Sequence, residues 1–270
     1  VGDGFFVWLS KPGDSGGARG RGESGDWRRE LLLRPAFRML LAALSFSLFV
    51  FCTSNPPVRI VDAQVTIPAR YDGFVYGDGE FCNDTILIEA FLDPICPDSR
   101  DAWPHLKRAV SHYTPLVYLI VHPFALPYHD NSFSACRALH IGNMLNSSAT
   151  YHLLEMFFRQ QERFYNKETY NRSKASVVGE ITELVVEAAG KSYYHAVKDG
   201  FTDRQTDLKT RVSFKYGCSR GVYGTPFFFV NGFQLPNAGS AIDYKGWRSF
   251  IDPLIGKQGL QTPRFVEWQR

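Results

Sequence analysis

Two apolar segments on either side of a helix-forming segment constrain the fold of this chain most strongly. The runs TILIEAFLD (85–93) and PLVYLIVHPFAL (115–126) are rich in β-branched and aromatic residues, which is typical of buried strands. Between them, residues 97–113 have helical spacing and begin with Pro97, since proline is tolerated at the first helical position. Pro104 lies inside this segment and predicts a kink or an irregular first turn. Strand, helix and strand in this order predict a right-handed parallel β-α-β unit.

The chain beyond the second strand predicts a long helical region, a hairpin and a terminal helix. In SVVGEITELVVEAAG (176–190) the apolar residues recur at helical spacing, and TYHLLEMFFRQQERFY (150–165) is amphipathic as well. The Asn231-Gly232 pair separates two short apolar runs, which is a strong signal for a two-residue β-hairpin. Residues 243–256 then predict a short helix with one apolar face.

The first 63 residues differ in composition from the rest of the chain. Residues 1–38 are rich in Gly and Arg without periodicity, and we interpret them as a disordered or non-native leader. Residues 39–63 contain an apolar run preceded by arginines and end in VDA, which is the layout of a secretory signal peptide. The alternative is a transmembrane helix, but that needs about 20 apolar residues and this run is shorter. We therefore expect a mature chain that begins near Gln64 and has no membrane anchor.

Three N-x-[ST] triplets also favour entry into the secretory pathway. Asn83, Asn146 and Asn171 each begin such a triplet and are candidate glycosylation sites of a secreted glycoprotein. With the signal peptide they indicate the secretory pathway, and the endoplasmic reticulum, the vacuole and the extracellular space remain alternatives.

Four cysteines follow the predicted signal peptide: Cys82, Cys96, Cys136 and Cys218. In an oxidising compartment they allow up to two disulfides in three pairings, among which the sequence does not choose.

The composition argues against several classes of function. Hydrophobic residues make up 44% of the chain, which is normal for a globular core. The formal net charge is only +3 and no dense Lys/Arg run occurs, so nucleic acid is not an expected partner. Cys136 and His140 are four residues apart, but no second pair of ligands accompanies them, so we expect no metal site.

The order of these features resembles the thioredoxin superfamily and, more closely, its DsbA-like branch. The segment IEAFLDPICPDS (88–99) is similar to the strand and CPxC helix start of that branch, and GVYGTPFFFVNG (221–232) to its cis-proline loop and hairpin. The resemblance covers about residues 85–254. It implies an α/β thioredoxin fold, with a central mixed sheet flanked by helices and an inserted helical domain.

The same resemblance divides the chain after the signal peptide into three parts. Residues 64–129 would form the first half of the thioredoxin fold, residues 130–216 the helical insertion, and residues 217–270 the second half.

Five residues are assigned to the site by this resemblance. Cys96 matches the nucleophilic cysteine of the family and is followed by Pro97. Pro226 matches the cis-proline, and Thr225 the residue whose backbone pairs with a bound substrate. Without the resemblance, a trans proline at a strand entrance would be the simpler reading of Thr225-Pro226. The second cysteine of the family is replaced by Ser99, so the site is CxxS (CPDS).

A cysteine at a helix start is favoured as a thiolate by the free N–H groups and the helix dipole. The Ser99 hydroxyl could donate a further hydrogen bond, but it cannot resolve a mixed disulfide as a second thiol would. Disulfide isomerisation, glutathione-dependent exchange and covalent capture of clients remain. Asp93, Asp98 and Asp101 lie near Cys96 and would either raise its pKa or serve as helix caps.

Four other residues are weaker candidates. His129 follows the second strand and is either a substrate contact or a surface histidine. Glu89 lies inside the first strand and is either a buried group for proton transfer or the partner of a lysine. His122 is expected to be a core histidine. Cys218 is the best distal candidate for a resolving thiol, against a structural disulfide or a free buried thiol.

These features predict thiol–disulfide exchange by a monothiol site on clients that carry thiols or disulfides. One alternative is a module that binds peptide or protein without chemistry. Another is a glutathione-dependent transferase or isomerase of the kappa type, with glutathione as a co-substrate. No other cofactor is expected.

Overall fold

The computed structural model describes residues 67–77, 85–236 and 239–258. The predicted leader and signal peptide, together with Cys82 and Asn83, lie outside these residues. In the described part of the chain, no helix is both long enough and apolar enough to span a bilayer.

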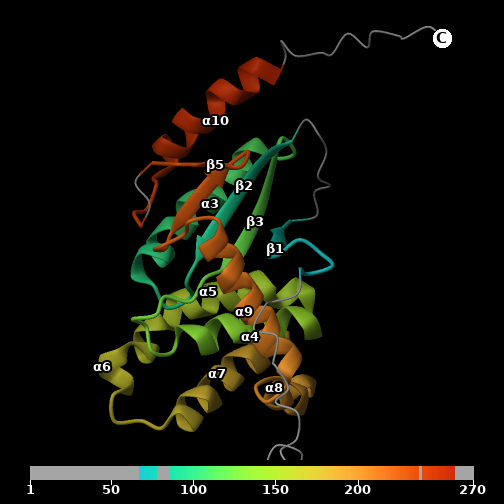
Figure 1. Ribbon diagram of the computed structural model, residues 1–270, viewed down its shortest axis with the longest axis vertical. Coiled ribbons are helices and arrows are strands. Elements are labelled where there is room, and N and C mark those ends of the chain that lie inside the picture. The colour runs from blue at the N-terminus through green and yellow to red at the C-terminus, as the bar shows by residue number, and fades with distance from the viewer. Residues whose placement is uncertain (1–66, 78–84, 237–238, 259–270) are drawn as a thin grey trace, which may run out of the picture. The chain divides into compact units, whose positions relative to one another are not determined.

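A five-stranded mixed sheet forms the centre of the fold, with the strand order β1-β3-β2-β4-β5 (Figure 1). Its strands are β1 (Phe74–Tyr76), β2 (Ile86–Leu92), β3 (Val117–Pro123), β4 (Phe227–Val230) and β5 (Phe233–Gln234). β2 and β3 are parallel, and every other neighbouring pair is antiparallel. The predicted β-α-β unit and the mixed sheet are confirmed.

The two faces of the sheet carry different apolar clusters because side chains alternate along a strand. Ile88 and Ala90 belong to the larger cluster, together with residues of α3 (Pro97–Tyr113) and α10 (Tyr244–Gln258). Phe91 faces the other way and belongs to a second cluster that includes Cys96. Cys96 therefore packs against the apolar cluster on the sheet face opposite α3 and α10.

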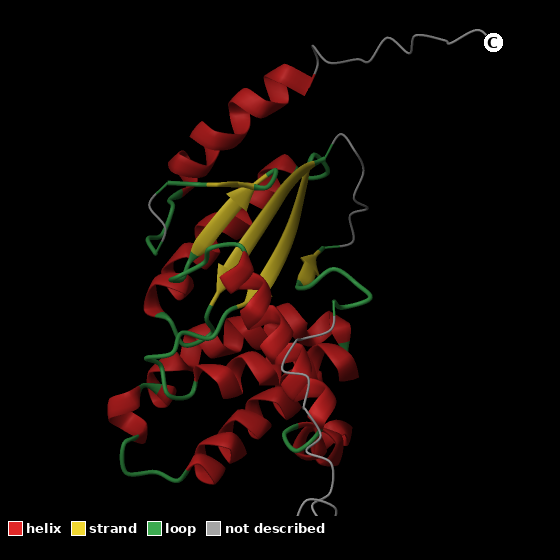
Figure 2. Cartoon of the chain, in the orientation of Figure 1, coloured by secondary structure: helices red, strands yellow, loops and turns green. Residues whose placement is uncertain are grey.

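Six helices and short 3₁₀ turns follow β3 before the chain returns to the sheet. They gather at the end of the sheet where β2 and β3 finish (Figure 2). The helices are α4 (Ser132–Leu145), α5 (Thr150–Gln160), α6 (Asn166–Thr169), α7 (Lys174–Ala189), α8 (Tyr194–Gly200) and α9 (Arg204–Ser219).

The hairpin β4–β5 turns at the predicted pair. Asn231 and Gly232 have φ values of 49° and 82°, which are the two positive values that a type I′ turn requires. Asn231 also ties the turn to β2, because its backbone N–H donates to the carbonyl of Leu87 (2.8 Å) and its Oδ1 accepts from the N–H of Leu87 (2.8 Å).

Three features of the fold differ from the sequence expectation. Strand β1 was not predicted, because three residues between Gly73 and Gly77 are too few to show a period. The expected kink at Pro104 does not divide α3, which runs as one helix past this exposed residue. The boundary expected after residue 216 falls inside α9, whose last turns pack on the sheet.

Gly217 of α9 marks the closest approach of that helix to the sheet. A Cβ at this position would lie 2.5 Å from the ring of Phe124 and 3.3 Å from that of Phe91. Gly217→Ala is therefore expected to lower the free energy of unfolding by about 1–3 kcal/mol, measured by urea denaturation. Gly179→Ala is the matched control, because a Cβ there meets nothing within 4 Å, and it should raise stability by about 0.5–1 kcal/mol. Equal effects of the two substitutions would contradict this packing.

Candidate functional site

Cys96 caps the N-terminus of α3, with Pro97 as the first helical residue. Its backbone is extended (φ −78°, ψ 124°), and its N–H donates to the carbonyl of Asp93 (3.1 Å). Its own carbonyl accepts from the N–H of Arg100 and so begins the helix (3.1 Å). The residue is only 3% exposed.

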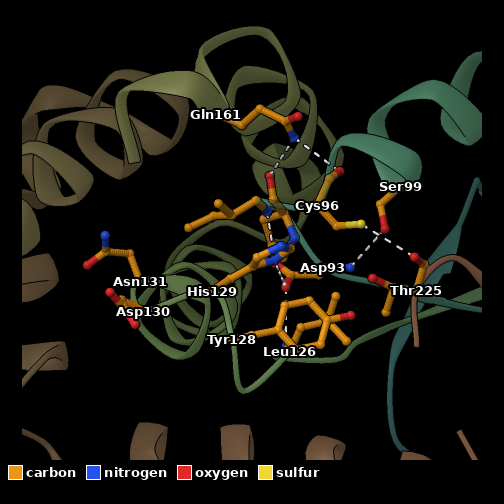
Figure 3. Close-up of polar contacts among 12 residues, drawn as sticks. Asp93, Cys96, Ser99, Leu126, Tyr128, His129, Asp130, Asn131, Gln161 and Thr225 are labelled. Atoms are coloured by element: carbon orange, nitrogen blue, oxygen red, sulfur yellow. Dashed lines mark hydrogen bonds and ion pairs between the residues drawn. The ribbon is translucent and has the colours of Figure 1, made fainter. Parts of the chain in front are cut away.

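The thiol of Cys96 lies against the loop that precedes β4. Its Sγ donates to the backbone carbonyl of Thr225 over 3.4 Å, as Figure 3 shows. The Thr225–Pro226 peptide bond is cis, as the family resemblance implies. Thr225 is itself buried, and its hydroxyl has no hydrogen-bond partner among the described residues. The fold thus brings together two segments that are 129 residues apart.

Ser99 is fully buried on the first turn of α3. Its hydroxyl oxygen accepts from the backbone N–H of Asp93 (3.2 Å). This contact assigns Ser99 to holding the turn that carries Cys96, which the sequence did not predict. The expected hydrogen bond from Ser99 to the sulfur is not among the contacts of the described residues.

The Asp93 carboxylate organises the same turn from inside the protein. It is fully buried, and its Oδ1 accepts from the N–H of Ile95 (2.8 Å). Its Oδ2 accepts from the N–H of Leu126 (3.2 Å) and lies 2.9 Å from His129 Nδ1. Asp93 is thus engaged by backbone groups and by His129, which the spacing of acidic residues alone did not reveal. His129 lies beside the site, half-buried, after the end of β3.

Gln161, at the end of α5, connects the helical insertion to the site. Its Nε2 donates to the carbonyls of Pro94 (3.3 Å) and Cys96 (3.2 Å), and the residue is fully buried (Figure 3). Its Oε1 accepts from the hydroxyl of Tyr165 (2.7 Å), which orients the amide. Sequence reasoning missed Gln161, because nothing in a local pattern ties a glutamine to a cysteine 65 residues away.

Glu89 is a buried carboxylate with several partners. The hydroxyls of Tyr71 and Tyr216 both donate to its Oε1 (2.7 Å each), and Arg220 forms an ion pair with its Oε2 (3.2 Å). Burial opposes ionisation, but His122, the two tyrosines and Arg220 outweigh it and lower the pKa of Glu89 to about 2. The expected lysine partner of Glu89 is replaced by an arginine.

His122 is the core histidine that the sequence predicted, and it is fully buried. Its Nδ1 lies 3.0 Å from an oxygen of Asp72, and its Nε2 lies 3.5 Å from Glu89 Oε1. Burial alone would lower the pKa of His122, but these two carboxylates raise it. The ion pairs therefore stabilise the fold fully below about pH 6.5 and are lost as the pH rises through the raised pKa.

Phe91 connects the surroundings of Glu89 with those of the thiol. Its ring stacks on His122 at 4.5 Å and belongs to the apolar cluster that contains Cys96. The contacts of Glu89 itself are with the two tyrosines, Arg220 and His122. Proton transfer between Glu89 and Cys96 stays a prediction.

Cys96, Cys136 and Cys218 are all free thiols. No disulfide therefore links these three, and any pairing of Cys82 lies outside the described residues. Cys136 is buried, and burial raises its pKa well above the usual value, which keeps the thiol protonated and unreactive. Cys218 is exposed at the end of α9, and partial burial of its sulfur raises its pKa as well.

The two candidate glycosylation sites in the described chain differ in setting. Asn146 is half-buried at the end of α4, where its Oδ1 accepts from the hydroxyl of Ser148 (2.7 Å) and its Nδ2 donates to the carbonyl of Ala189 (3.4 Å). Asn171 is exposed in the turn before α7.

Glu89→Gln tests the buried carboxylate. A pKa lowered from 4.5 to about 2 contributes about 3 kcal/mol at neutral pH, and this contribution is lost as the pH falls from about 4.5 towards 2. The variant should therefore be less stable at pH 7 by about that amount and should lose less stability on acidification, measured by urea unfolding across pH. The exposed Glu187→Gln on α7 should change stability by less than about 0.5 kcal/mol. An unchanged pH slope in the Glu89 variant would contradict the network.

Gln161→Leu tests the link between the insertion and the Cys96 turn. The leucine keeps most of the volume but leaves the buried carbonyl of Pro94 without this donor, which should cost about 1–3 kcal/mol of stability. Amide hydrogen exchange at Cys96 should accelerate together with this loss. Gln160→Leu, one residue earlier, is the control, because its side chain bonds only the exposed Arg163 in the described contacts and should leave exchange at Cys96 unchanged. Equal exchange in both variants would show that Gln161 does not hold the turn.

Comparisons with known proteins identify the fold. No family model and no curated protein matches the chain. Among solved structures, alpha-DsbA1 from Wolbachia pipientis has a TM-score of 0.56 at 17% identity, covering 74% of this chain and 96% of that one. A proposed protein-disulfide isomerase from Pseudomonas syringae has a TM-score of 0.55 at 20% identity, covering 67% of this chain and 98% of that one. The chain therefore shares the fold of these structures, the thioredoxin fold, here a mixed sheet flanked by helices with a helical insertion.

Proposed function

We propose that this protein carries out thiol–disulfide exchange through Cys96, as a monothiol enzyme of the secretory pathway. One observation carries the proposal: the Cys96 thiol, at the start of α3, touches the backbone carbonyl of Thr225 before a cis-proline. A reactive thiol and a backbone group that can receive an extended client thus lie side by side.

The start of α3 supplies the means to form a thiolate. The first N–H groups of a helix have no partner within it, and the dipole is positive at this end. Both stabilise negative charge on Cys96. The thiolate attacks a client disulfide, a bond forms between Sγ and one client sulfur, and the other client sulfur leaves as a thiolate that takes a proton from water.

Because Ser99 replaces the resolving cysteine, the mixed disulfide is released only by another client thiol or by a small thiol. Release by another client thiol gives isomerisation, release by a small thiol reduces the client disulfide while the small thiol is oxidised to a mixed disulfide, and without release the client stays captured. This balance needs no cofactor.

The Thr225 carbonyl is a contact that the thiol and a client would share. In the free protein the Cys96 thiol donates to this carbonyl over 3.4 Å. A thiolate has no proton to donate, so during attack by the thiolate the carbonyl is free to accept from the N–H of an extended client segment, as in strand addition.

The rival is a binding module without chemistry, and burial of Cys96 as a hydrogen-bonded thiol favours it. The two differ in what Cys96→Ser does: an exchange enzyme loses its activity, and a binding module keeps its clients. A secreted glycoprotein modified at Asn146 and Asn171 remains our expectation for its location, because an oxidising compartment supplies disulfide clients.

Reactivation of a client with scrambled disulfides tests the proposal. The wild-type protein should speed reactivation in the presence of a small thiol, and Cys96→Ser should abolish the effect. Ser99→Cys should restore a CxxC pair, and after prior oxidation of that pair to a disulfide it should oxidise an equimolar amount of reduced client while its own disulfide is reduced to two thiols, which the wild type cannot do. Cys218→Ser is the control thiol and should retain the wild-type rate. Full activity of Cys96→Ser would overturn the proposal.

A further inference from the structure

Two exposed tyrosines lie in the two loops that contact the Cys96 turn. Tyr128 is 60% exposed in the loop after β3, and Tyr223 is 71% exposed two residues before Thr225. Tyr223 packs edge-on against Phe227, a member of the apolar cluster that contains Cys96. The exposed rings have no apolar cover of their own, so they are available to a bound chain.

Acidic residues lie near Tyr128 and Cys96. Asp98 is exposed at the start of α3, whereas the Asp93 carboxylate is buried against His129. Burial raises the pKa of Tyr128, and the negative charges of Cys96, Asp93 and Asp98 raise it further.

Arg100, a cation in the first turns of α3, is already paired. It contacts Asp101 at 2.9 Å and Glu162 at 3.7 Å, and both carboxylates are well exposed. These ion pairs place Asp101 and Glu162 beside the start of the helix that Cys96 caps. With Asp98 included, three exposed carboxylates stand against one shared guanidinium.

From this arrangement we infer that the site takes cationic client segments, with Lys or Arg beside the reacting cysteine, and discriminates against anionic thiols such as glutathione. The inference rests on the proposed function, because it names the substrate class of the same site. Thr225 supplies an independent sign of a missing ligand: it is 3% exposed, faces Cys96 (Figure 3), and its hydroxyl has no partner among the described residues.

Two interactions would recognise such a client. A Lys or Arg side chain stacks on an exposed tyrosine face through a cation–π contact, here Tyr128 or Tyr223. The same cation is attracted by Asp98 and Glu162. Glutathione has two carboxylates and one ammonium, so these acidic residues repel its net negative charge. The guanidinium of Arg100, which could otherwise attract it, is already engaged by two carboxylates.

The covalent step is the exchange already described. A bond forms between Cys96 Sγ and the client sulfur, the client disulfide breaks, and its other sulfur leaves as a thiolate. No electrons are gained or lost overall, so charge around the site changes only the rate and the affinity.

The test uses three disulfide probes with the same aryl-thiol leaving group. Two are nine-residue peptides with a central cysteine flanked by Lys or by Glu, and the third is glutathione. The Lys probe should react with Cys96 at least about tenfold faster than the other two at low salt, within the usual range of electrostatic steering. The difference should shrink as salt rises.

Variants that remove carboxylate charges show which residues cause the difference in rate between the probes. Asp98→Asn combined with Glu162→Gln should bring the rates of the Lys and Glu probes together. Glu183→Gln, an exposed change on α7, should leave the ratio as it is in the wild type. Cys96→Ser should lose the fast reaction with the Lys probe, and any remaining labelling should map by mass spectrometry to other thiols such as the exposed Cys218.

Binding of serine analogues of the two peptides separates the inference from the proposed function. Tighter binding of the Lys analogue without any disulfide reaction would support the cationic client and overturn the exchange activity. Reaction of all three probes at equal rates would support exchange and overturn the inference. Equal binding of both analogues with no reaction would overturn both.

Discussion

The buried carboxylate of Asp93 is the interaction on which the geometry of the site depends. A desolvated carboxylate is costly unless hydrogen bonds satisfy it, and Asp93 gains them from the turn before α3 and from the loop after β3. It thereby fixes two loops that follow neighbouring parallel strands. The backbone of Asp93 takes part as well, since its carbonyl accepts from Cys96 and its N–H donates to Ser99. Moving this one residue would disturb every group around the thiol.

The helical insertion is part of the same site. Gln161 reaches from the end of α5 to the carbonyl of Cys96, so the orientation of α5 is transmitted to the turn that carries the thiol. The cis-proline loop, which belongs to the second half of the thioredoxin fold, contacts the thiol of Cys96 as well. Three segments remote in sequence therefore determine how the sulfur is presented. The start of a helix alone would provide a favourable electrostatic environment for the sulfur, but it would not orient the sulfur in this way.

The order of elements was predictable because it rests on local signals. Apolar runs, helical periods and the Asn231-Gly232 pair act within a few residues, and each was found where the pattern placed it. The family resemblance then brought Cys96 and Thr225 together, which no periodicity could do. Partners of buried polar groups were not predictable. Gln161 meets Cys96 across 65 residues, and the register of such contacts depends on how whole helices pack.

The Glu89 network has a consequence for how the chain is made. The hydroxyls of Tyr71 and Tyr216 lie 2.7 Å apart although 145 residues separate them in the chain, and both donate to Glu89. Arg220, the balancing cation, lies 131 residues beyond Glu89. During synthesis the strand that contains Glu89 leaves the ribosome long before that arginine does. The central sheet face therefore cannot be closed over its carboxylate until nearly the whole domain has been translated, and such a chain depends on late, long-range contacts to complete its core.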